Sequence, residues 1–158
     1  MSLGLYLHIP YCFSKCRYCD FYSHPGERGV PDAYVEALVR ELDRFAPERP
    51  LQPDTLYFGG GTPSLLRPEQ AKRLIDAARP MPGAEITLEA NPETVTEESL
   101  AGFREAGVNR ISFGVQSARD TQLRTLGRPH TAKQARAAFA AARRAGFANI
   151  SGDIMLAL

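Results

Sequence analysis

Cysteine is scarce in this chain. Its 158 residues include only three, Cys12, Cys16 and Cys19, and all of them lie close to the N-terminus. An odd number of clustered cysteines makes a poor disulfide framework but suits metal or cluster ligation in a reducing compartment. A chain of this length can bury a sizeable core and needs no disulfide for stability. The cysteines are therefore expected to bind a metal or a cluster.

An excess of charge and a long apolar run are also missing. Nineteen basic residues balance 18 acidic ones, so the formal net charge is +1 and gives no reason to expect nucleic acid or an anionic membrane as a partner. No stretch approaches the roughly 20 apolar residues of a membrane-spanning segment. The opening residues, MSLGLYLHIPYC, lack the basic leader and cleavage site of a signal peptide. These absences predict a cytoplasmic protein.

What the sequence does contain is an alternation of short β-like runs with amphipathic stretches of helical period. In 32–45, for example, Tyr34, Leu38 and Leu42 recur at four-residue spacing behind Asp32, which can cap a helix. We expect strands at 3–9, 55–58, 85–90, 110–115 and 149–156, helices at 32–45, 68–79 and 132–145, and a further helix that opens at 96–99 and stops at Gly107. This order predicts an α/β fold of parallel strands with helices outside.

The last expected strand, 149–156, has no helix after it. A sheet that ended there would leave an unprotected edge. We therefore expect residues 1–158 to form one domain that is incomplete at its C-terminus, either part of a β/α barrel or part of a doubly wound sheet.

The three cysteines have the spacing CxxxCxxC. Three thiolates on one short loop can ligate three irons of a [4Fe–4S] cluster and leave the fourth iron open. The open iron can chelate the amino and carboxylate groups of S-adenosylmethionine (SAM), whose carbon–sulfur bond is then broken by an electron from the cluster. The metal-ligand prediction is therefore Cys12, Cys16 and Cys19.

A zinc site is the alternative for the same cysteines. His8, Asp20 or His24 could supply a fourth ligand. Zinc loops usually pair two CxxC knuckles that lie far apart in the sequence, and this chain has no second knuckle. The spacing therefore favours a cluster over zinc.

The segment 6–21, YLHIPYCFSKCRYCDF, resembles the opening of the radical SAM proteins related to oxygen-independent coproporphyrinogen III oxidase (HemN), and especially the HemW heme chaperones. The resemblance extends over essentially the whole chain. It implies a partial (β/α)6 radical SAM barrel of about five parallel strands, truncated before the last strand and without a C-terminal domain.

The run 59–63, GGGTP, comes directly after an expected strand. Bare glycines let a backbone approach a ligand closely and leave N–H groups free to bind it, although a glycine triplet on its own is more often just a turn. The run resembles a family motif that meets the amino end of SAM. The resemblance thus implies Gly60, Gly61 and Thr62 as cofactor contacts.

Other implied SAM contacts lie where strands end, the usual place for binding residues in β/α barrels. Glu89 ends the third expected strand, Gln116 follows the fourth and Asp153 lies on the fifth. Arg128, twelve residues after Gln116, matches a family arginine that could pair with the cofactor carboxylate. Each resembles a family residue at the corresponding position.

Tyr6 and Tyr18 are expected from the resemblance to flank the cluster and SAM, although Tyr18 could serve only as a shield for the cluster. The histidines His8 and His130 fall in family-like segments, and we expect a packed or surface role for each. Asn91, which precedes a proline, is expected simply to end a strand.

The choice among relatives depends on the residues after the third cysteine. HemN has a further cysteine where this chain has Phe21, whereas Asp20–Phe21, Ser23–His24 and the 126–130 segment LGRPH resemble HemW. The resemblance implies a heme chaperone or heme transferase that binds heme or a tetrapyrrole, takes electrons from a donor such as flavodoxin and passes heme to an acceptor protein. Oxygen-independent coproporphyrinogen III oxidation in porphyrin biosynthesis is the alternative, and a non-catalytic zinc-binding module is the third hypothesis.

Overall fold

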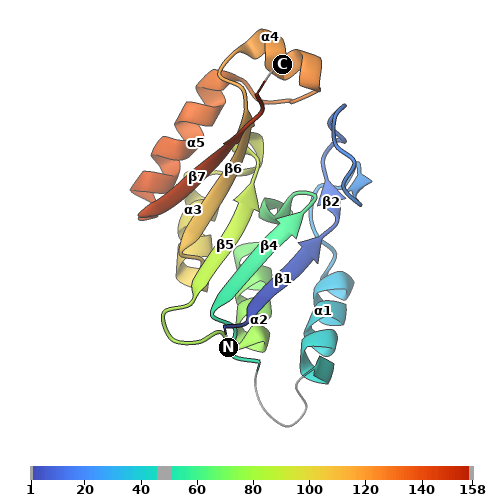
Figure 1. The fold of residues 1–158 in the computed structure, drawn as a ribbon, viewed down its shortest axis with the longest axis vertical. Helices are drawn as coiled ribbons and strands as arrows, with labels where there is room; N and C mark the ends of the chain where they lie inside the picture. Colours follow the sequence, from blue (N-terminus) through green and yellow to red (C-terminus); the bar gives the residue numbers. More distant parts are fainter. Residues whose placement is uncertain (1, 46–50, 157–158) are drawn as a thin grey trace.

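The fold is built on one parallel sheet. The computed structural model describes residues 2–45 and 51–156. Five parallel strands are paired in the order β1-β4-β5-β6-β7, with their C-terminal ends at the top of Figure 1. Their bounds are β1 Gly4–Ile9, β4 Thr55–Gly60, β5 Glu85–Ala90, β6 Arg110–Gln116 and β7 Asn149–Ile154. The predicted strand order and direction are confirmed.

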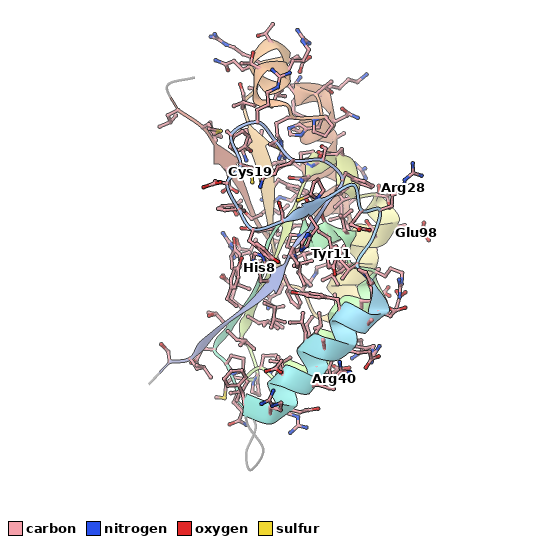
Figure 2. The ribbon with its side chains drawn as sticks, turned by 90° about the vertical axis from the view of Figure 1, so that its right-hand side faces the viewer. His8, Tyr11, Cys19, Arg28, Arg40 and Glu98 are labelled. Atoms are coloured by element: carbon pink, nitrogen blue, oxygen red, sulfur yellow. The ribbon has the colours of Figure 1, made fainter. Side chains whose placement is uncertain are left out.

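Four helices form one layer against this sheet. They are α1 Asp32–Phe45, α2 Pro68–Ala78, α3 Glu97–Ala106 and α5 Ala132–Arg144. Contacts join α1 to α2, α2 to α3, and α3 to α5. In the edge-on view of Figure 2, α1 lies on one side of the strands, and the loop that carries Cys19 lies near their upper ends. None of the helices in the described residues is long and apolar enough to cross a membrane.

The two faces of the sheet differ because side chains alternate along each strand. The face toward the helices is apolar and carries the buried core residues Leu7, Ile9, Leu56, Phe58, Leu88, Ile111 and Phe113. The opposite face carries polar side chains such as Tyr57, Glu89 and Arg110, each only partly buried. Within the described residues the sheet is open, with β1 and β7 as its two edges. One polar, uncovered face matches the inner wall of a β/α barrel that is not closed.

The helix ends follow the local signals in the sequence. Thr96 caps α3 by accepting a hydrogen bond from the Ser99 N–H at 3.1 Å, and Gly107 ends it with φ 112°. Thr131 caps α5 in the same way, with Gln134 as its partner. These reciprocal contacts satisfy backbone groups that a helix leaves unpaired, so the predicted boundaries fall within a residue or two of the observed ones.

Several short elements were not predicted. The seven-residue helix α4, Asp120–Leu126, spans too few turns for its hydrophobic period to stand out. Two 3-10 turns, η1 Pro63–Leu65 and η2 Pro92–Thr94, and the small pair β2 Tyr11–Cys12 and β3 His24–Pro25 are also additions. The last strand ends at Ile154 rather than at 156.

Candidate functional site

A hollow of about 320 Å³ lies at the C-terminal ends of the strands. This edge is where ligands bind in parallel α/β folds. All the predicted site residues except Tyr6 line it: Cys12, Cys16, Tyr18, Cys19, Gly60, Gly61, Thr62, Glu89, Gln116, Arg128 and Asp153. The structure thus brings together residues that are distant in the sequence.

The cysteine loop between β2 and β3 is held by the backbone. Its ends come together where β2 pairs with β3, and the Arg17 N–H donates to the Leu126 carbonyl at the end of α4 at 3.0 Å. Cys12 is buried, whereas Cys16 and Cys19 are partly exposed, and all three are free thiols. The loop therefore presents three unpaired sulfurs to one hollow.

Three thiolates on one loop are the ligands that a [4Fe–4S] cluster with one open iron needs. In the described part of the chain, no three His, Cys, Asp or Glu side chains are placed to hold one metal ion. Thiolates of a [4Fe–4S] cluster bind separate irons and need not converge on one point. A cluster with one open iron therefore requires only the three cysteines as ligands.

Arg128 connects the cysteine loop to the sheet. Its Nη1 donates to Cys16 Sγ at 3.4 Å, and its Nη2 donates to Asn91 Oδ1 and to the Gly114 carbonyl at 2.6 Å each. Its Nε is buried and has no hydrogen-bond partner among the described residues. Because buried donors are nearly always paired, an acceptor such as a ligand carboxylate would complete this guanidinium. This unpaired nitrogen fits SAM as the ligand.

The glycines of the GGGTP run allow close packing. A Cβ on Gly61 would lie 2.7 Å from the Tyr11 carbonyl oxygen and 2.9 Å from Cys12 Sγ, and Gly60 has φ 115°. The expectation of a free N–H group is wrong for Gly61, because its N–H donates to the Ile9 carbonyl at 2.8 Å. Here the absence of side chains lets the cysteine loop sit against β4.

Glu89 lies on the polar face of β5 and is partly buried. Burial raises the pKa of its carboxyl group and nearby Asp153 adds to the rise, while hydrogen bonds from Tyr57 and the Gly60 N–H oppose it. The Tyr57 hydroxyl donates to Oε1 at 2.7 Å, and burial together with this bond raises the pKa of Tyr57. Tyr57 therefore stays neutral and is a donor that steadies the carboxylate.

This raised pKa predicts a pH-dependent stability. A folded-state pKa above the unfolded one means that the folded chain holds the Glu89 proton more tightly. The resulting stabilisation is complete below the unfolded pKa of roughly 4.3 and is lost as pH rises through the folded pKa. We expect the free energy of unfolding of wild type minus that of Glu89→Gln to fall with rising pH, by about 1.4 kcal/mol per unit of pKa difference. Urea unfolding of the cofactor-free chain between pH 4 and 8 measures it.

Glu97→Gln is the matched control for that experiment. The Arg144 guanidinium, which donates to the Glu97 carboxylate at 2.8 Å, lowers the pKa of Glu97. Its stabilisation is present above the unfolded pKa and lost as pH falls, so the wild-type-minus-variant difference should have the opposite slope. A pH-independent difference for Glu89→Gln would contradict the assignment.

The remaining predicted residues take different positions. Gln116 ends β6 with the left-handed φ of 64°, unusual for a side chain other than glycine, beside a bulge in the β6–β7 register. Burial raises the pKa of Tyr18, and the nearby positive charge of Arg128 opposes the rise. Tyr6 is 54% exposed and stacks on Tyr57 with ring centroids 6.0 Å apart, so it lies beside the hollow rather than in it.

Two residues make side-chain contacts that their sequence context did not indicate. His130 is buried as expected, with its ring nitrogens 3.1 Å from Glu93 Oε2 and 3.1 Å from the Val115 carbonyl oxygen. Asn91 does end a strand, but its side chain also bonds to Arg128 and Thr62 inside the hollow. Its place two positions after Glu89, at the same end of the sheet, was the available signal.

Comparison with known proteins agrees with this geometry. The heme chaperone HemW of Escherichia coli (strain K12) is 44% identical over 161 residues, covering 97% of this chain and 42% of that protein. HemW of Bacillus subtilis (strain 168) is 41% identical, again covering 97% of this chain and 42% of that protein. The chain thus spans less than half the length of these relatives.

A solved structure and a family profile extend the comparison. Coproporphyrinogen III oxidase (HemN) from Escherichia coli, described as a radical SAM enzyme, superposes with a TM-score of 0.86 at 31% identity, covering 97% of this chain and 37% of that one. The profile of the radical SAM superfamily, a family that implies a [4Fe–4S] cluster and SAM, matches residues 6–158. By sequence and by fold, this chain belongs to the radical SAM superfamily.

Proposed function

We propose that Cys12, Cys16 and Cys19 hold the [4Fe–4S] cluster and that the hollow beside them binds SAM. The observation that carries this proposal is the convergence of three free thiols and the incompletely paired Arg128 on one cavity at the C-terminal edge of the sheet. When bound and reduced, the cluster supplies the electron that cleaves SAM. An external one-electron donor such as a flavodoxin would supply that electron.

The residues around the hollow bind and orient the cofactor. We assign the SAM carboxylate to Arg128, whose Nε lacks a partner, and its amino group to the wall formed by Gly60, Gly61 and Thr62. Glu89 and Asp153 line the same hollow and supply acceptors for donors of the cofactor. Gln116 and Tyr18 complete the wall and help to exclude water from the reacting bond.

We further propose that the protein is a heme chaperone in the cytoplasm, where thiols remain reduced. The support is the name carried by relatives that are 39–44% identical over 97% of the chain. Phe21, which lines the hollow, and its chain neighbour Tyr22 are 66% and 72% exposed, and their rings offer an apolar surface to a porphyrin. Heme would pass from such a surface to an acceptor protein.

Heme binding is the test of that proposal. The protein is reconstituted anaerobically with iron and sulfide and then titrated with ferric heme. Its absorption spectrum follows the binding. We expect saturable binding at one heme per chain and no conversion of coproporphyrinogen III when SAM and a reductant are added. Absence of heme binding by the reconstituted protein contradicts the chaperone proposal.

Oxidation of coproporphyrinogen III is the second candidate, favoured by the superposition on HemN. The resemblance implies, however, a further cysteine in that oxidase at the position where this chain has Phe21. The same titration separates the two candidates, because turnover of coproporphyrinogen would replace the chaperone by the oxidase. Neither outcome alters the cluster proposal, which is tested by iron and sulfide analysis.

A further inference from the structure

Two of the three cysteine sulfurs accept hydrogen bonds from one continuous network. Arg128 Nη1 donates to Cys16 Sγ at 3.4 Å, and the Thr62 hydroxyl donates to Cys12 Sγ at 3.5 Å. Asn91 lies between the two donors, 2.6 Å from Arg128 Nη2 through Oδ1 and 3.1 Å from Thr62 Oγ1 through Nδ2. The network therefore runs from one sulfur to the other through a single amide.

The direction of each bond in this network follows from the donors available. A guanidinium has no acceptor, so the oxygen of the Asn91 amide has to face Arg128, and the amide nitrogen then faces Thr62. Because Thr62 Oγ1 accepts from that nitrogen, its only proton is free for Cys12 Sγ. Asn91 thus directs the Thr62 proton toward the sulfur.

The packing around Asn91 holds this arrangement in place. The Gly114 carbonyl accepts a second bond from Arg128 Nη2 at 2.6 Å, and a Cβ on Gly114 would lie 3.1 Å from both that nitrogen and Asn91 Oδ1. Thr62 is 3% exposed and Arg128 is 9% exposed. Hydrogen bonds shielded from water in this way are electrostatically stronger than exposed ones.

We propose that Asn91 is a positioning residue that raises the reduction potential of the cluster by directing hydrogen bonds to the sulfurs of Cys12 and Cys16. Reduction adds negative charge to the cluster and its ligands, and donors aimed at the sulfurs stabilise that charge. Asn91 touches neither sulfur and acts through Thr62 and Arg128. The inference rests on the proposed cluster at these cysteines.

The test is a potentiometric titration of the reconstituted protein, followed by electron paramagnetic resonance of the reduced cluster. Thr62→Val keeps the shape of the side chain and removes the hydroxyl, and we expect the equilibrium constant for one-electron reduction to fall about tenfold, which is ~59 mV. Asn91→Asp places an acceptor opposite Thr62 and turns the Thr62 proton away from Cys12. We expect it to lower the potential at least as far, since it also adds negative charge.

The double variant N91D/T62V separates the hydrogen-bond effect from that of the added charge. In the N91D background the Thr62 proton already points away from Cys12, so removing the hydroxyl should lower the potential no further. Equal effects of Thr62→Val in both backgrounds would overturn the inference. So would a wild-type potential in either single variant.

Ser64→Ala is the matched control. Ser64 is a buried hydroxyl two residues after Thr62. It pairs with Thr94, which donates to the backbone carbonyl of Asn91 and not to its side-chain amide, so Ser64 reaches neither Thr62 nor a cysteine sulfur. We expect its potential and resonance spectrum to match wild type, and circular dichroism of each cofactor-free variant verifies the fold. Failure of the cluster proposal would appear differently, because then wild type itself would take up no iron and sulfide.

Discussion

Replacement of Cys16 by alanine is expected to abolish cluster loading. With only Cys12 and Cys19 left, the loop supplies two of the three thiolates that a cluster with one open iron needs. Cys16 is also the sulfur that receives the Arg128 hydrogen bond, so the change removes both the ligand and the acceptor of that bond. Anaerobic reconstitution should give a brown wild-type protein and a colourless variant without iron or sulfide.

Ser14→Ala is the control for this loss. Ser14 lies on the same loop and lines the same hollow but has no thiol. It should load iron and sulfide as wild type does. A brown Cys16→Ala protein would contradict the cluster assignment, and a colourless wild type with one zinc per chain would support the zinc-binding module.

Gly61→Ala is expected to impair both folding and cluster loading. Two of the three nearest neighbours of the added Cβ are backbone carbonyl oxygens, on Tyr11 and Ile9, and the third is Cys12 Sγ. A backbone carbonyl cannot rotate away as a flexible side chain can, so β1 or the cysteine loop has to shift. Overpacking of this kind costs about 1–3 kcal/mol, and the shift displaces a cluster ligand.

Gly29→Ala provides the comparison. The nearest atom to its added Cβ is the Leu65 carbonyl oxygen at 3.9 Å, an ordinary contact. Urea unfolding should show a loss of stability for Gly61→Ala only, and iron analysis should show incomplete loading for that variant only. Full loading of Gly61→Ala would mean that the loop does not depend on this close approach.

The sheet and its helices could be predicted from the sequence because the helix caps and hydrophobic periodicity agreed with the alternation of strands and helices along the chain. Thr96 and Thr131 start helices where hydrophobic periodicity begins, and Gly107 ends one where it stops. Parallel strand order then followed from the alternation of strand and helix. The shared position of Glu89, Gln116 and Asp153 beside one hollow followed from their places at strand ends.

What the sequence could not show were relations between side chains. Asn91 looks like an ordinary strand end until Thr62 and Arg128 are placed beside it. The N–H group of Gly61 looked available until the Ile9 carbonyl was found to accept from it. Helix α4 was missed because its seven residues are held by neighbours more than by their own periodicity. Pairings of this kind depend on three-dimensional proximity, which propensity and spacing do not encode.

The bond from the Arg17 N–H to the Leu126 carbonyl ties the cysteine loop to the end of α4, just before Gly127 and Arg128. Joining two segments so distant in the chain costs loop-closure entropy, and a single closure orders both segments. A ligand that makes residues 12–19 rigid therefore also favours the ordered form of 120–128, by linkage. Insertion of iron and sulfide is therefore expected to stabilise residues 12–19 and 120–128 together.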